Sequence, residues 1–234
     1  MAGGPGTDDD LAAVLRRAAE ATSGGRREGD DVVPLGPKAA KTRSSLLAAA
    51  YQQLVERGYS ATAVEHVHEA AGVSLGTFYQ YFRDKADVMR TLVGEAITAS
   101  APTMFRPLDL MDGHDSVRNV IEGFVRSYAA TAPFQRLWEE ATHVDDDLAA
   151  LRRDVSRLLD AAVRDAIIDA QKAGVVDPNL DAERSSRALS AMVDRTCYVT
   201  FVVEDGGVDA TDEVIETLVR LWVNALQMRR KSRA

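Results

Sequence analysis

The chain has 234 residues, and 46% of them are hydrophobic, which is enough for one large or two small folded domains. A single cysteine, Cys197, excludes an intrachain disulfide framework and a multi-cysteine zinc site, and the net charge of −8 gives no general attraction for nucleic acid. Aspartates at positions 8–10 stand where a signal peptide would be basic and then apolar, and no stretch approaches the ~18 apolar residues of a membrane span. We therefore expect a cytoplasmic protein.

Residues 1–37 have the composition of a flexible N-terminal arm. They hold seven of the 16 glycines and three of the seven prolines, and their 4 basic and 7 acidic side chains give a charge of −3. Apolar residues at helical spacing between Leu11 and Ala18 are compatible with a short helix over residues 10–22, but we expect the arm to stay loose or to dock only weakly.

From Thr42 onward nearly every segment has the period of an amphipathic helix. The first helix is expected to end at Gly58, and its apolar face holds Leu46, Leu47, Ala50, Tyr51, Leu54 and Val55. Further stripes follow at about 115–128, 133–141, 148–170, 181–204 and 211–231, with Asp115 and Asp181 as N-caps. No segment alternates with a period of two, so we expect no strands and an all-α fold.

The last two predicted helices are more apolar than one buried stripe requires. Two such helices favour a homodimer held by a four-helix contact, and deep burial within one chain is the alternative. The residues expected at the dimer interface are Cys197, Leu218, Trp222 and Ala225.

Residues 62–85 carry the strongest functional signal and read TAVEHVHEAAGVSLGTFYQYFRDK. Thr62 can cap a short helix, Gly72 can adopt a left-handed turn, and Ser74 can cap a second helix with Phe78 and Phe82 pointing inward. This pattern is typical of a helix-turn-helix, whose second helix enters the major groove of DNA. The side chains then left on outer faces are Leu75, Gly76, Thr77, Tyr79, Gln80 and Tyr81.

The chemistry of these outer residues suits DNA. Gly76 allows a close backbone approach, Thr77 and the tyrosines offer hydroxyls to phosphates, and Gln80 can pair with an adenine. Residues 38–100 carry 7 basic and 6 acidic side chains, and a charge of only +1 argues against a sequence-indifferent DNA organiser. Further phosphate contacts are expected from Arg43, Thr62 and Lys85.

The runs RGYSATAV and AAGVSLGTFYQYFRDK make residues 42–100 resemble the DNA-binding domain of the TetR family of bacterial transcription regulators. The resemblance implies about nine helices, with a three-helix head and a body that binds a ligand and dimerises through its last two helices. It divides the chain into the arm 1–37, a helix-turn-helix domain 38–84 and a ligand-binding and dimerisation domain 85–234. By matching position it implies DNA contacts by Thr62, Ser74, Leu75, Gly76, Thr77, Tyr79, Gln80, Tyr81 and Lys85.

Two positions depart from the family pattern. His68 stands where alanine is usual, and we expect it to reach solvent from a repacked helix pair, with a pH-sensitive head as the alternative. Leu75 stands where lysine is frequent, which favours contact with a thymine methyl group over a phosphate contact.

The resemblance implies a regulator, most often a repressor that binds a palindromic DNA operator as a dimer and is released by a small molecule. The apolar body favours a hydrophobic ligand, and Arg126, Arg136 or His143 could meet an acidic group on it. The residues expected to line its pocket are Met104, Phe105, Phe124, Tyr128, Phe134, Leu137, Trp138, Met192 and Phe201.

The alternative function is a helical di-iron carboxylate enzyme. Glu65–His68 and Glu140–His143 both read E-x-x-H, the pairing that such proteins contribute twice. Two further inward glutamates would be needed, whereas the long helices place alanine and leucine inward. We therefore expect no metal, no cofactor and no enzymatic activity.

Overall fold

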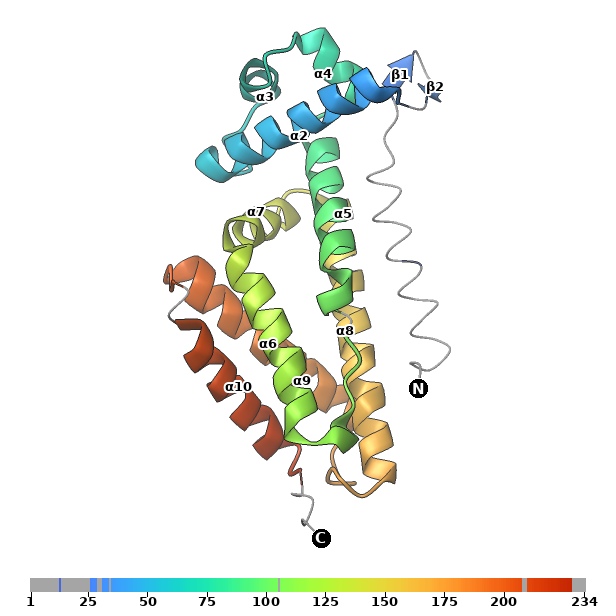
Figure 1. Ribbon diagram of the computed structural model, residues 1–234, viewed down its shortest axis with the longest axis vertical. Helices are drawn as coiled ribbons and strands as arrows, with labels where there is room; N and C mark the ends of the chain where they lie inside the picture. Colours follow the sequence, from blue (N-terminus) through green and yellow to red (C-terminus); the bar gives the residue numbers. More distant parts are fainter. Residues whose placement is uncertain are drawn as a thin grey trace. The chain divides into compact units, whose positions relative to one another are not determined.

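The structure is a computed structural model that describes residues 13, 26–28, 31–33, 35–104, 106–207 and 210–228. Over these ranges the chain forms nine α-helices, α2 to α10 (Figure 1). The prediction of an all-α fold with about nine helices is confirmed. Apart from Ala13, which is helical, the segment 10–22 of the arm lies outside the described residues, as does Phe105.

One short pair of strands departs from the expectation that there are none. β1 (Arg26–Glu28) pairs antiparallel with β2 (Asp31–Val33), so that Arg26 lies opposite Val33. Each strand has three residues, which is too short for an alternating pattern to reveal it.

The chain packs as two compact units. The head unit is Ala13–Ala99 with Arg136–Arg152, and the body unit includes Ser100–Gln135 and Arg153–Ala234. The predicted boundary at residue 85 differs from this division, because most of α5 and residues 136–152 pack with the head. The head unit contains α2 (Pro37–Arg57), α3 (Val64–Ala70), α4 (Leu75–Tyr81) and most of α5 (Lys85–Met104).

The head unit is built around the buried face of α2. This helix begins at Pro37, earlier than predicted, and ends at Gly58, whose φ of +84° suits a residue without a side chain. Tyr51 and Val55 are 37% and 39% exposed, so the buried stripe is narrower than predicted. The core that α2 shares with α3, α4 and α5 consists of Leu46, Leu47, Ala50, Val67, Phe78, Tyr81, Phe82 and Val88.

The body unit packs α6 (His114–Ala130), α9 (Ala182–Tyr198) and α10 (Ala210–Ala225) around one apolar core, and Figure 1 shows these three helices side by side. Asp181 caps α9 as predicted, whereas Gly113 rather than Asp115 precedes α6. A π-helix, Val199–Val203, extends α9. The other helices are α7 (Ala132–Thr142) and α8 (Asp146–Lys172), and a 3₁₀ turn lies at Leu110–Asp112.

Among the described residues, no helix combines the length and the hydrophobicity that a membrane span requires.

Three of the four residues predicted at a dimer interface lie inside this core. Cys197, Leu218 and Trp222 are 0%, 1% and 3% exposed within a single chain. Their placement corrects the prediction: this part of the apolar excess of α9 and α10 serves intramolecular packing against α6. Ala225 is exposed.

Candidate functional site

The turn between α3 and α4 is held by backbone bonds and one side chain. The N–H of Ala71 donates to Val67 O and the N–H of Val73 donates to His68 O, each at 3.0 Å, around Gly72 with its φ of +67°. His68 Nδ1 lies 3.0 Å from Val73 O, a contact in which the ring nitrogen donates. The half-buried His68 therefore fixes the turn, a role that the sequence did not predict.

Helix α4 is fixed at its start and along its inner face. Ser74 Oγ accepts from the N–H of Thr77 at 3.1 Å and lies 2.9 Å from Thr77 Oγ1, which confirms Ser74 as the N-cap. Phe78 and Phe82 are 0% and 2% exposed, and their ring centres are 5.8 Å apart. These anchors determine which side of α4 stays outside the core.

The outer side of α4 carries five residues that we call the reading face: Leu75, Gly76, Thr77, Tyr79 and Gln80. Tyr79 is 47% exposed and Leu75 is 37% exposed, while Thr77 and Gln80 are half-buried. A Cβ atom at Gly76 would meet only Ser74 Oγ, at 3.8 Å, so packing within the head does not require a glycine there. The reading face offers apolar, hydroxyl and amide groups together, the mixture that contacts bases and phosphates.

Two other residues predicted to contact DNA are buried. Tyr81 is 7% exposed and belongs to the head core. Thr62 is 2% exposed, and its hydroxyl donates to Gly58 O at 2.7 Å and lies 3.1 Å from Gln53 O. The N-cap of α3 is Ala63 rather than Thr62. Both side chains are therefore used in packing the head, and the DNA contacts expected of Tyr81 and Thr62 stay predictions.

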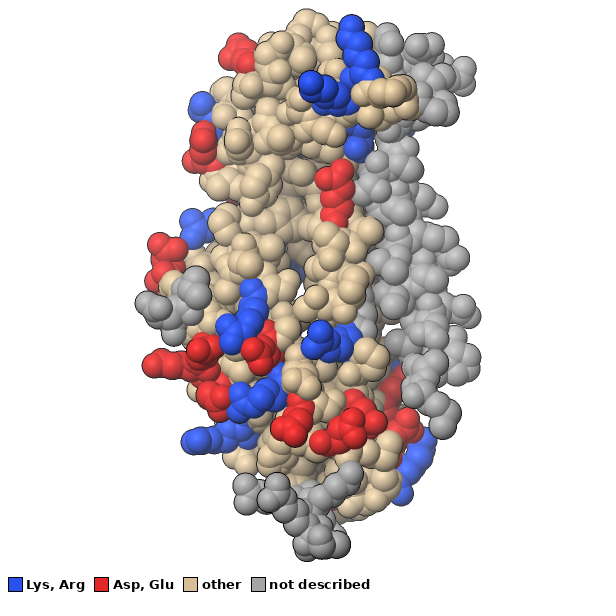
Figure 2. Space-filling view, viewed as in Figure 1, with Lys and Arg blue, Asp and Glu red and all other residues tan. Residues whose placement is uncertain are grey.

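The two predicted phosphate-binding cations are also engaged within the head unit. Lys85 Nζ donates to Tyr59 O and lies 4.5 Å from the centre of the Tyr59 ring. Arg43 is 8% exposed, with its guanidinium 5.4 Å from the centre of the Phe82 ring and 3.7 Å from a carboxylate oxygen of Glu95. Both cations thus have partners within the head, and their expected phosphate contacts stay predictions. Figure 2 shows scattered charged side chains of both signs on the visible face over α2 to α4.

Glu140 on α7 holds the loop between α2 and α3. Its carboxylate accepts from the N–H groups of Tyr59 and Ser60, each at 2.8 Å. Burial of the carboxyl opposes its ionisation, but these two donors and the charge of Lys85 outweigh burial and hold the pKa of Glu140 below its usual value. Sequence reasoning missed this contact because the partners are 80 and 81 residues away.

The E-x-x-H pairs do not form a metal centre. His143 is exposed and its Nδ1 bonds to Glu139 O, while Glu140 binds backbone N–H groups and Glu65 is exposed. Within the described ranges, no three His, Cys, Asp or Glu side chains are grouped so as to hold a metal ion. The pairs are structural and surface residues of the head unit.

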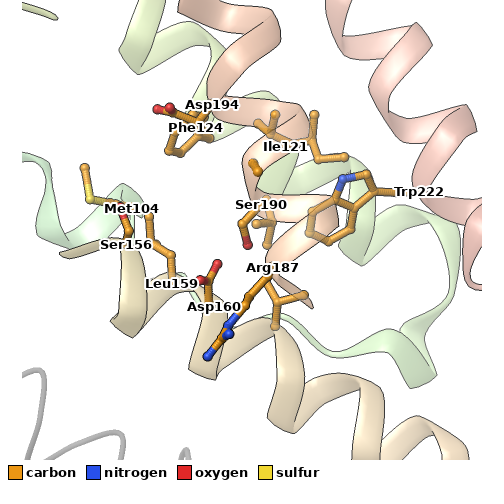
Figure 3. Close-up of a pocket in the computed structure, with 14 residues that line it drawn as sticks. Met104, Ile121, Phe124, Ser156, Leu159, Asp160, Arg187, Ser190, Asp194 and Trp222 are labelled. Carbon is orange, nitrogen blue, oxygen red and sulfur yellow. The ribbon is translucent and has the colours of Figure 1, made fainter. Parts of the chain in front are cut away.

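The body unit contains a cavity of about 240 Å³ (Figure 3). Of the residues predicted to bind a ligand, Met104 and Phe124 line it, and so does Trp222, which was predicted at the dimer interface. The lining is mostly apolar and comes from α5, α6, α8, α9 and α10, including Ile121, Leu159 and Val163.

The other described residues predicted to bind a ligand do not line this cavity. Tyr128, Phe134 and Phe201 are buried in packing, and Met192 packs against the body core. Leu137 and Trp138 belong to the head unit. The residues proposed to meet an acidic ligand group also lie elsewhere: Arg126 pairs with Glu122 and Asp212, while Arg136 and His143 are exposed in the head unit.

Two family models match this chain. One, described as "Bacterial regulatory proteins, tetR family", matches residues 46–92, which include α3, the turn and α4. The other, described as "Transcriptional regulator EthR, C-terminal domain", matches residues 117–227, which include α7 to α10 and the cavity residue Trp222. The chain belongs to the TetR family.

Curated relatives that this TetR-family chain matches over most of their length are transcriptional regulators. EthR of Mycobacterium tuberculosis, an HTH-type transcriptional regulator, is 28% identical over 187 residues, which are 78% of this chain and 85% of EthR. TtgR of Pseudomonas putida, another HTH-type regulator, is 26% identical over 166 residues, 67% of this chain and 79% of TtgR. This chain is accordingly a DNA-binding transcriptional regulator rather than an enzyme.

Solved structures share the fold. NalD of Pseudomonas aeruginosa, the secondary repressor of the MexAB-OprM multidrug efflux pump, aligns with a TM-score of 0.67 at 19% identity and covers 83% of this chain and all of NalD (100%). FadR of Bacillus halodurans, a fatty acid degradation regulator, aligns with a TM-score of 0.62 at 20% identity, over 84% of this chain and 100% of FadR. The TetR-family fold therefore extends over both units.

Proposed function

We propose that this TetR-family regulator is a cytoplasmic repressor that binds a palindromic operator as a dimer and releases it when a small hydrophobic molecule occupies the body cavity. The observation that carries the proposal is the reading face of α4, which is fixed from within by Phe78, Phe82 and the Ser74 cap while its outer side chains stay accessible. Such a helix enters the major groove with little rearrangement.

Each residue of the reading face has a role in this proposal. Gln80 pairs with an adenine through its amide, and Leu75 and the ring of Tyr79 contact thymine methyl groups. Thr77 and the Tyr79 hydroxyl bind phosphates, and Gly76 lets the backbone approach the duplex. With Lys85 and Arg43 engaged in the head, these contacts rather than a basic surface supply the affinity.

Dimerisation is proposed through the outer faces of α9 and α10. Thr217, Leu221 and Ala225 lie at four-residue spacing on the exposed side of α10, and Leu221 is 45% exposed. Ala188 on α9 is exposed and small enough for close helix packing. A two-fold four-helix contact buries these residues and presents two reading faces to major grooves about 34 Å apart.

A ligand in the cavity can act on the head through α5. This helix begins at Lys85, which contacts Tyr59 in the head unit, and ends at Met104, which lines the cavity. A ligand that binds more tightly to one position of Met104 stabilises the corresponding position of α5. This shift changes the separation of the two heads in the dimer.

The test is selection of bound fragments from random double-stranded DNA by the purified protein. We expect a palindrome from the wild type and its loss in the double variant Tyr79→Phe/Gln80→Ala. The matched control, Tyr51→Phe/Gln52→Ala, changes the same residue types at exposed positions of α2 and should keep the palindrome. If the wild type enriches no sequence at low salt, or the double variant retains the palindrome, the proposal is wrong.

A further inference from the structure

Two residues that line the cavity in the body unit each have a buried polar atom without a hydrogen-bond partner among the described residues. These atoms are Nε1 of Trp222, a side chain that is 3% exposed, and Oγ of Ser190. The indole N–H can only donate, while the hydroxyl can donate or accept. Unpaired buried polar atoms are rare in folded proteins. An occupant that supplies a hydrogen-bond acceptor at Trp222 and a polar group at Ser190 satisfies both atoms.

Acidic side chains dominate the charge around the cavity. Asp160 on α8 and Asp194 on α9 both line it. Arg187 is the single cation among the described residues that line the cavity, and its Nη2 pairs with a carboxylate oxygen of Glu183 at 2.7 Å. Figure 3 shows the carboxylate of Asp160 directed toward Ser190, while the guanidinium of Arg187 extends away from Trp222. The cavity therefore attracts a positively charged group and disfavours an occupant that carries a carboxylate.

The volume limits the size of the occupant. An apolar cavity of about 150 Å³ accommodates benzene, so about 240 Å³ accommodates one aromatic ring with a short chain. The apolar lining, which includes Met104, Phe124 and Leu159, suits the ring.

We propose that the cavity selects a small alkylamine that carries an aromatic ring and an oxygen acceptor. The ring packs among the apolar side chains, the oxygen accepts from Trp222 Nε1, and the protonated amino group lies at Asp160 and Ser190. This inference rests on the proposed ligand response of the regulator and specifies the chemical class of its ligand.

The test uses small probes that differ by one group. Phenoxypropylamine has the ring, an ether oxygen and the amine; phenoxypropanol replaces the amine with a hydroxyl; phenoxybutanoate replaces it with a carboxylate; phenylbutylamine replaces the ether oxygen with a methylene. Each is titrated calorimetrically into the full chain. We expect phenoxypropylamine to bind about tenfold more tightly than phenoxypropanol, and phenoxybutanoate to bind most weakly. Phenylbutylamine should bind several-fold more weakly than phenoxypropylamine, because it leaves Trp222 Nε1 unpaired.

Single-residue variants test which side chain contacts which group of the probe. Asp160→Asn should abolish the preference for amine over alcohol while leaving phenoxypropanol binding unchanged. Asp169→Asn, on the same helix but outside the cavity, is the matched control and should keep that preference. Trp222→Phe should make the ether and methylene probes bind equally; because Trp222 is a core residue, Ser190→Ala, which should weaken amine binding, provides a second variant of lower structural risk.

The inference is overturned if no probe binds, if the alcohol or carboxylate binds as tightly as the amine, or if the amine preference survives Asp160→Asn. These results are independent of the DNA selection above. Amine binding that leaves operator affinity unchanged would support the cavity's selectivity and refute the proposed release mechanism.

Discussion

Removal of the Glu140 carboxylate should destabilise the head unit by a measurable amount. The carboxylate accepts two backbone hydrogen bonds at 2.8 Å, from Tyr59 and Ser60. Hydrogen bonds to charged groups contribute about 1.5–3 kcal/mol each. Because the Glu140 side chain is only half-buried, we take the lower value, so Glu140→Ala should cost about 3 kcal/mol. Glu140→Gln keeps one acceptor oxygen and should cost about half as much.

The pH dependence of this loss follows from the lowered pKa of Glu140. A carboxyl with a lower pKa in the folded than in the unfolded chain stabilises the fold above its unfolded pKa, about 4.3, and loses that contribution as the pH falls through the folded value. The difference in unfolding free energy between wild type and Glu140→Gln should therefore be largest near neutral pH. It should shrink at pH values below about 4.

Urea unfolding followed by circular dichroism measures both quantities. Glu139→Gln is the matched control, since Glu139 neighbours Glu140 and forms a partly exposed ion pair with Arg152 at 3.3 Å. That change should cost less than about 1 kcal/mol. A cost for Glu140→Ala no larger than that of the control, or an unchanged pH dependence for Glu140→Gln, would refute the assignment of Glu140 as the anchor of this loop.

Four further predictions follow from the two units. Gln80→Ala should weaken binding to the selected operator by about 1–3 kcal/mol and leave random DNA unaffected in fluorescence anisotropy; equal loss on both would exclude base reading. Lys85→Met should lower the urea midpoint but leave the salt dependence of operator binding unchanged, whereas a shallower dependence would identify Lys85 as a phosphate contact. Burial, with the nearby Asp194, raises the pKa of the Cys197 thiol to about 12, so iodoacetamide at neutral pH should modify the folded chain at least ~1,000-fold more slowly than the urea-unfolded chain; comparable rates would contradict its burial. Leu221→Glu should convert a dimer to a monomer in sedimentation velocity, and a persistent dimer would place the interface elsewhere.

The helix-turn-helix could be predicted because its signals are local. Gly72 adopts the left-handed turn, Ser74 caps α4, and Phe78 and Phe82 meet one helical turn apart. Each of these features depends on residues within about one turn of helix, so spacing along the sequence is sufficient to recognise it.

Whether a side chain faces solvent or contacts another part of the chain could not be predicted in the same way. Lys85 was expected to contact a phosphate, but its partner Tyr59 lies 26 residues away in sequence. Glu140 binds residues 80 and 81 positions away. A cation or carboxylate looks the same in the sequence whether it faces solvent or another helix. Only the packed fold shows which charged side chains bind a partner within the chain.

The position of the cavity could not be predicted from the sequence either. Helical spacing indicates that Phe124 and Tyr128 face inward, but it does not show where inward side chains leave space. Tyr128 fills the core, whereas Phe124 and Trp222 border a cavity. That difference depends on the volumes of residues from five separate helices.

In the head, the residues that stabilise the fold differ from the residues of the reading face, and this separation has an evolutionary consequence. Lys85, Arg43 and Thr62 hold the head together, while the reading face contributes little to its core. Substitutions at Leu75, Tyr79 and Gln80 are therefore nearly free of a folding penalty. A gene duplicate could acquire a new operator through these positions alone, without first passing through an unstable intermediate.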